Sequence, residues 1–247
     1  MASALPRKTA ALYMLESSSE LAVKQAEDCF QLNLEEAGLV SGGGFQVYST
    51  EDYRVSVDMA NGYRVYEALR PLPQSRQRSI TDEEAKALAA FVEENGLWDG
   101  ESYDIALSHS TTGGWTGPEA VTSTSVWFYP AINGLPVVGI FRICVTLDMA
   151  GNIVSVYKQV NDILESRQVP VLEAAELDLR LTEGDYAAQA STTLTDAALT
   201  DCMLSYYGDG YSVNGKTYLY PVALLRGSGT APDGTAESFS ILFGLIA

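Results

Sequence analysis

The stretch YPAINGLPVVGIFRICVTLDMAGN, residues 129–152, places two turn signals around one long apolar run. Asn133-Gly134 suits a two-residue hairpin turn, because both residue types tolerate positive φ. A second turn signal covers residues 149–152, and an apolar run that includes alternating polar residues follows it. The stretch therefore predicts an antiparallel β-meander with strands at 127–130, 137–147 and 153–160. In this interpretation one face of the middle strand carries Val137, Gly139, Phe141, Ile143, Val145 and Leu147.

Other segments rich in β-branched and aromatic residues predict more strands. Near the N-terminus, apolar and polar residues alternate on both sides of residues 50–54, after a loop at Gly42–Gly44. Asn61-Gly62 predicts a second hairpin there. Further strands are expected at 103–108, 122–130, 199–207, 216–226 and 238–245.

Three segments predict helices. Apolar residues recur at three- and four-residue spacing between 22 and 37, and Gly38 ends that run. Thr81 and Glu84 form a capping box before a second apolar stripe, because each side chain can accept a hydrogen bond from a backbone amide. The third helix follows Pro170 and ends at Gly184.

Helices and blocks of strands follow one another without a βαβ alternation. This order predicts an α+β fold, in which antiparallel sheet meanders carry helices packed on one face. A helix followed by several strands recurs, which raises degenerate tandem repeats as an option. The polar connector at 71–79 suggests a division into residues 1–78, an N-terminal helix plus β-hairpin module, and residues 79–247, which form the α+β module or modules.

The net charge of −17 constrains the partners of this chain. Such an acidic surface repels phosphate backbones and anionic lipid, so we expect no nucleic-acid partner and no electrostatic docking on membranes. No apolar stretch reaches the roughly 18 residues that a membrane helix needs, so no direct membrane insertion is expected. Cys29, Cys144 and Cys202 have no close-spaced motif, and buried free thiols are the expected state.

The sequence contains no catalytic signature. His109 is the one histidine, and neither a nucleophile elbow nor a phosphate-binding loop is present. Histidines and cysteines are too few for a zinc site, and we expect no metal and no cofactor. The 32 carboxylates leave paired-acid hydrolysis open, although no pair lies in a distinctive apolar setting.

Aromatic residues supply the candidate binding surface. Tyrosine and tryptophan are large, rigid and polar at one end, which suits a groove for sugar or peptide, but the same residues also favour strands. Packing within the sheet is therefore the competing interpretation. The candidate surface comprises Trp115, Trp127, Tyr206, Tyr207, Tyr218 and Tyr220.

The meander motif resembles PepSY-like domains, including thermolysin-type propeptides, and is similar to the YycH/YycI-type extracytoplasmic regulators of Gram-positive bacteria. The closing segments at 204–207 and 218–222 match the last strands of these families, and the resemblance extends from about residue 80 to the end. It is carried by Tyr129, Asn133-Gly134-Leu135-Pro136-Val137, Gly139, Val145, Leu147-Asp148, Gly151, Ile153 and Ser155.

The resemblance implies a non-enzymatic, extracytoplasmic binding or regulatory protein that acts through protein–protein contacts, with a sensor kinase as a possible target. Attachment to the cell surface would need a segment absent from this chain, and a true start at Met1 would instead imply a cytoplasmic protein. Two alternatives stay open. One is a propeptide-like protease inhibitor or chaperone acting in trans, and the other is a carboxylate-dependent hydrolase of cell-wall carbohydrate.

Overall fold

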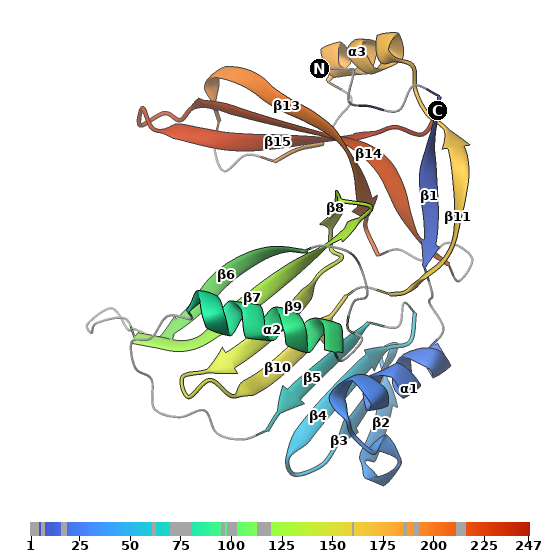
Figure 1. Ribbon diagram of the computed structural model, residues 1–247, viewed down its shortest axis with the longest axis vertical. Coiled ribbons are helices and arrows are strands. Elements are labelled where there is room, and N and C mark those ends of the chain that lie inside the picture. Colours follow the sequence, from blue (N-terminus) through green and yellow to red (C-terminus); the bar gives the residue numbers. More distant parts are fainter. Residues whose placement is uncertain are drawn as a thin grey trace.

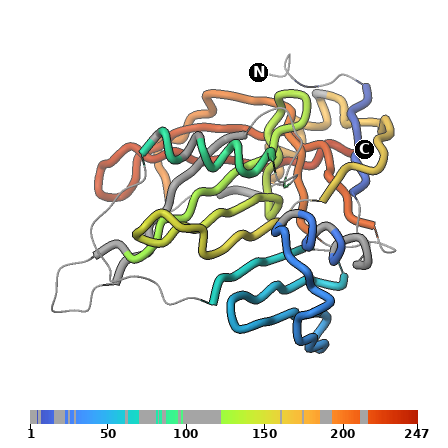
Figure 2. The backbone as a smooth tube through the Cα atoms, turned by 60° about the horizontal axis from the view of Figure 1, so that its bottom comes forward, coloured from blue at the N-terminus to red at the C-terminus, as the bar shows by residue number. Residues whose placement is uncertain are grey.

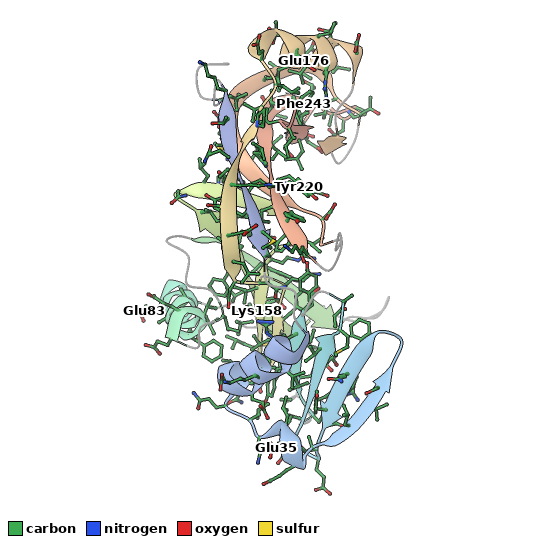
Figure 3. The ribbon with its side chains drawn as sticks, turned by 90° about the vertical axis from the view of Figure 1, so that its right-hand side faces the viewer. Glu35, Glu83, Lys158, Glu176, Tyr220 and Phe243 are labelled. Atoms are coloured by element: carbon green, nitrogen blue, oxygen red, sulfur yellow. The ribbon has the colours of Figure 1, made fainter. Side chains whose placement is uncertain are left out.

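The computed structural model describes residues 5, 8–15, 19–60, 63–69, 81–94, 97, 103–112, 120–159, 161–184, 187–189, 193–210 and 216–247. These residues form one mixed sheet of 15 strands and three α-helices. The sheet is divided visibly into two halves, which we call the lower and the upper sheet after their places in Figure 1. Seen from the side, the molecule is elongated, with Glu176 near one end and Glu35 near the other (Figure 3).

The lower sheet is a continuous antiparallel array with the strand order β2-β3-β4-β5-β10-β9-β7-β6. Its strands are β2 (Gly38–Gly42), β3 (Phe45–Ser49), β4 (Tyr53–Asp58), β5 (Arg64–Ala68), β6 (Tyr103–Thr112), β7 (Ala120–Ile132), β9 (Ile143–Asp148) and β10 (Ile153–Lys158).

The meander predicted at 129–152 is confirmed at both of its turns. Asn133 and Gly134 have φ values of 51° and 72°, and they join β7 to β8 (Leu135–Gly139). The second turn joins β9 to β10, where the Asp148 carboxylate accepts hydrogen bonds from the backbone of Ala150 and from both the backbone and the side chain of Asn152, at 2.8–3.0 Å. Short polar side chains thus fix the turns that set the strand register.

Two helices contact one face of the lower sheet: α1 (Ser19–Phe30) touches β4 and β5, and α2 (Asp82–Glu94) touches β7. Leu88 and Val92 of α2 are buried in the main hydrophobic cluster together with Val126 and Phe128 of β7. The predicted capping box is confirmed, because the amide of Thr81 donates to Glu84 Oε2 at 2.9 Å and the amide of Glu84 donates to Thr81 Oγ1 at 3.2 Å. The box starts α2 where the sequence indicated.

The upper sheet combines the two ends of the chain. Its strands are β1 (Thr9–Leu15), β8, β11 (Ile163–Pro170), β12 (Ala187–Gln189), β13 (Thr195–Gly208), β14 (Thr217–Thr230) and β15 (Ala236–Gly244). Strand β1 pairs with both β11 and β14, so the blue N-terminal strand lies among yellow and red segments in Figure 2. Helix α3 (Ala174–Glu183) contributes Leu177 to the second buried cluster, beside Phe243 of β15.

Strand β8 joins the two halves. It forms a hairpin with β7 of the lower sheet and pairs in parallel with the end of β13 in the upper sheet. The contact is close: a Cβ added at Gly208 would overlap the ring of Phe141, and Ser205 Oγ donates to the carbonyl of Pro136 at 2.7 Å. The halves are thus linked by backbone pairing and by a tightly packed aromatic ring.

The expected α+β fold is wrong. The described residues are mostly β, and their strands form one large mixed sheet with only three α-helices. The middle strand expected at 137–147 is in fact two strands, β8 and β9, because the chain leaves the upper sheet after Gly139 and enters the lower sheet at Ile143. The six residues placed on one face of that strand are therefore divided between β8, β9 and the segment that joins them, but all of them except Gly139 belong to the same buried cluster.

Several other expectations have mixed outcomes. The first helix ends at Phe30 rather than at residue 37, and Gln31 adopts a φ of 54°. The hairpin between β4 and β5 is confirmed by their register, whereas Asn61-Gly62 lies outside the described residues. The boundary at residue 78 also lies outside them and stays a prediction. Among the helices described, none combines the length and the apolar character needed to cross a membrane.

Candidate functional site

The candidate aromatic surface is divided by the fold. Trp115 lies outside the described residues, and Tyr206 is buried against Tyr13, with ring centroids 4.9 Å apart. Trp127 belongs to the lower sheet, where the guanidinium of Arg142 lies 4.7 Å from its ring centroid. Tyr207, Tyr218 and Tyr220 remain, and these three come together in the upper sheet.

Tyr207 and Tyr220 lie directly opposite each other in the register of β13 and β14. Both line an open groove with a volume of about 660 Å³, together with Asp209, Arg180 of α3 and apolar residues from the ends of β14 and β15. The ring of Tyr218 lies 6.1 Å from that of Tyr220, and Figure 3 shows Tyr220 in the upper half of the molecule, between Phe243 and Lys158. The groove is therefore an aromatic and aliphatic surface with one cation and one carboxylate among its described lining residues.

The charges of this groove do not favour acid–base chemistry. Burial raises the pKa of Tyr220, and the nearby Asp209 carboxylate and Tyr218 raise it further, so its hydroxyl stays protonated and can donate a hydrogen bond. Arg180 already pairs with Glu176 at 3.0 Å. Paired-acid hydrolysis needs two carboxyl groups across the substrate, and the described lining supplies only Asp209.

A second pocket, of about 620 Å³, does contain two carboxylates, Asp52 and Asp148. Burial alone would raise the pKa of Asp148, but hydrogen bonds from the Asn152 side chain and from the backbone of Asn152, Ala150 and Gly151 hold that pKa below its ordinary value. A general acid needs the opposite shift. Asp148 is therefore a turn-forming residue, and the described residues contain no group of three or more His, Cys, Asp or Glu side chains arranged to hold a metal.

Strand β2 is the most unusual surface of the lower sheet. All five residues of GLVSG are exposed, with Leu39 at 52% and Val40 at 67% exposure, and Phe45 on the neighbouring strand is 46% exposed. The strand pairs with β3 on one side, and it ends the strand order of the described sheet on the other. It has neither a charged residue nor a proline, which are the usual protections of an edge strand.

The turn after β2 fixes which backbone groups face outward. Gly43 and Gly44 have φ values of 61° and 85°, which fit a two-residue type I′ turn closed by the pair Gly42 and Phe45. Hydrogen-bonded and non-bonded pairs alternate along an antiparallel ladder, so Leu39 and Ser41 direct their N–H and C=O groups away from β3. Among the described strands, none pairs with this outer main-chain edge of Leu39 and Ser41.

The sequence analysis also does not predict two buried cations. Arg64 and Lys158 are register partners on β5 and β10, and each residue is 1% exposed. Arg64 Nη1 donates to Asn161 Oδ1 at 3.4 Å, and Lys158 Nζ lies 3.9 Å from Asp162 Oδ1. Figure 3 places Lys158 between the two helices of the lower half. These contacts make the cations internal parts of the sheet rather than a surface site.

The sequence analysis does not predict β2, because the helical spacing of apolar residues continues to residue 37 and Gly38 resembles a helix stop. The signal that identifies the strand is the sequence LVSGGGFQV, in which three glycines separate short segments of strand-forming residues. Of the cysteines, Cys144 and Cys202 are buried free thiols as expected, and burial raises the pKa of each. The side chain of Cys29 lies outside the described part of the chain.

Comparison with known proteins gives a fold likeness only. No family model and no curated protein matches this chain. Among solved structures, the chain is similar to an uncharacterized protein from Eubacterium rectale ATCC 33656, with a TM-score of 0.51 and 12% sequence identity, over 94% of this chain and 82% of that one. At that identity the likeness concerns the arrangement of elements and assigns no activity.

Proposed function

We propose that this chain is a non-enzymatic binding protein that takes up an extended segment of a partner protein along strand β2. The observation that carries the proposal is the exposed, uncharged and proline-free edge of the lower sheet, with outward backbone groups at Leu39 and Ser41. An added strand would satisfy those groups with main-chain hydrogen bonds. The sheet would then extend by one strand without rearrangement of β3.

Side chains beside the edge supply selectivity. In strand addition, backbone bonds provide affinity and the side chains on either face select the sequence. Leu39 lies on the face that α1 covers, in line with Tyr48 and Val55, whereas Val40 lies on the opposite face beside Val47. A bound segment would therefore meet an apolar side chain on each face of the sheet.

The resemblance to PepSY-like and YycH/YycI-like proteins agrees with a binding role. On this proposal the protein acts outside the cytoplasm, and its partner is a protein such as a sensor kinase or a protease. Strand addition suits a regulator because the main-chain contacts form and break as one cooperative unit. The aromatic groove at Tyr207 and Tyr220 would then be a secondary contact surface.

Selection from a phage-displayed library of random peptides tests this proposal. Enriched peptides should bind the parent chain and the Ser41→Ala variant equally, because alanine keeps the outward amide. They should lose binding to Ser41→Pro, because proline removes that donor and projects its ring toward the added strand. Equal binding to Ser41→Pro would reject strand addition at β2.

A further inference from the structure

The surroundings of β2 also indicate the chemistry of its partner. We propose, on the basis of strand addition at β2, that the bound segment is cationic: it has apolar residues in its middle and Lys or Arg at the end that lies beside Glu35 and Glu36. Residues 27–58, which run from the end of α1 through β4, contain seven carboxylates and a single cation, Arg54. The carboxylates are Glu27, Asp28, Glu35, Glu36, Glu51, Asp52 and Asp58.

Exposed carboxylates precede the Gly38 end of the strand rather than lying along it. Glu35 and Glu36 are exposed in the short 3-10 helix (Leu34–Glu36) that leads into Gly38. Arg54 does not offset them, because its guanidinium is 3.5 Å from Glu67.

The middle of the edge has the opposite character. Leu39, Val40 and Phe45 are all close to half exposed or more, and no charged side chain separates them. A partner strand would therefore bury apolar residues at its centre and place one of its ends beside Glu35 and Glu36. Basic residues are favoured at that end by charge complementarity, which also speeds the encounter of the two chains.

A second copy of this chain fits the same edge poorly. Each copy would bring its own Glu35 and Glu36 to the shared edge and would supply no basic residue from its own β2. Both chains also carry a net charge of −17. Like charges that face each other across an interface disfavour the complex. The charge pattern thus selects a basic partner over self-association.

Two synthetic peptides of matched core test the inference: KKVTVTVKK and EEVTVTVEE, each labelled for fluorescence anisotropy. The basic peptide should bind at least about tenfold more tightly at low ionic strength, and the difference should shrink as salt is added. The double variant Glu35→Lys/Glu36→Lys should narrow or reverse the preference. The control Asp178→Lys/Glu183→Lys makes the same change of net charge on exposed residues of α3, and it should leave the preference within about twofold.

The possible outcomes separate the two proposals. If both peptides bind equally and Ser41→Pro abolishes both, strand addition stands and the cationic partner is rejected. If the α3 control changes the preference as much as the β2 variant does, the effect is one of net charge and the inference is also rejected. If neither peptide binds, or if Ser41→Pro has no effect, strand addition fails and the inference fails with it.

Discussion

Strands β2 and β11 end the strand order of the described sheet at opposite sides, and they are protected very differently. Strand β11 is mostly exposed, like β2, but it contains Glu165 and Arg167 and ends at Pro170. Strand β2 has the sequence GLVSG and none of these features. Charges and proline on an edge prevent pairing with other chains, so an edge without them either aggregates or has a partner. Of these two edges, β2 is therefore the one that we propose for binding.

The comparison depends on both edges belonging to one folded unit, and the junction at Gly208 tests this most strongly. Gly208→Ala should destabilise the protein by about 2–3 kcal/mol, because the new methyl overlaps the ring of Phe141. Urea unfolding followed by circular dichroism measures the loss. The control Gly244→Ala places its methyl in open space and should change stability little. Equal effects of the two variants would contradict the close packing between the halves.

The hairpin at Asn133-Gly134 belongs to the same junction and should show a smaller effect. Gly134 has a φ of 72°, and a β-branched residue is strained in that region. Gly134→Val should therefore cost about 1–2 kcal/mol in unfolding free energy, and Gly134→Asn should recover most of that cost. Thermal melts of the three chains provide the measurement. Unchanged stability of the valine variant would undo the hairpin assignment.

Asp148 tests whether a change outside β2 can lower the stability of the lower sheet. A carboxyl whose folded pKa is lowered stabilises the fold above its unfolded pKa of about 3.9, and this contribution is lost as the pH falls through the folded pKa. Asp148→Asn should cost about 1 kcal/mol at neutral pH, and the cost should shrink toward about pH 2. A cost that is constant across this range, in denaturant unfolding of both chains, would contradict the role of the charged carboxylate.

Removing the charged residues of β11 should change the free energy of unfolding least among these variants. The same change tests the comparison between β11 and β2 most directly. Glu165→Thr/Arg167→Thr makes that edge as uncharged as β2, and both residues are exposed, so the change in stability should stay within about 0.5 kcal/mol. Self-association, measured by sedimentation equilibrium, should rise relative to the parent chain. Unaltered association would mean that charge is not what protects this edge.

Local patterns in the sequence predicted the turns and caps correctly, because these depend on neighbouring residues. The type I′ turn at Asn133-Gly134 and the capping box at Thr81 and Glu84 are examples. The fold class was wrong because pairing between distant segments decides it. The pairing of β1 with β11 and β14, and the parallel pairing of β8 with β13, have no local signal.

The candidate site shows the same limit. Tyr206 and Tyr207 are adjacent in a strand, so their side chains point to opposite faces of the sheet. One is buried against Tyr13, and the other lines the groove with its register partner Tyr220. Strand periodicity could have separated them in advance. The sheet order decides which tyrosine faces the core and where Trp127 lies relative to both. That order cannot be read from the sequence.

Amide hydrogen exchange at Leu39 and Ser41 tests the central claim most directly. Both amides point away from β3, so they should exchange rapidly in the free protein and become protected when a selected peptide binds. The inward amides of Val40 and Gly42 provide the internal control, because β3 protects them in both states. A bound peptide that leaves the exchange of Leu39 and Ser41 unchanged would contradict strand addition at β2.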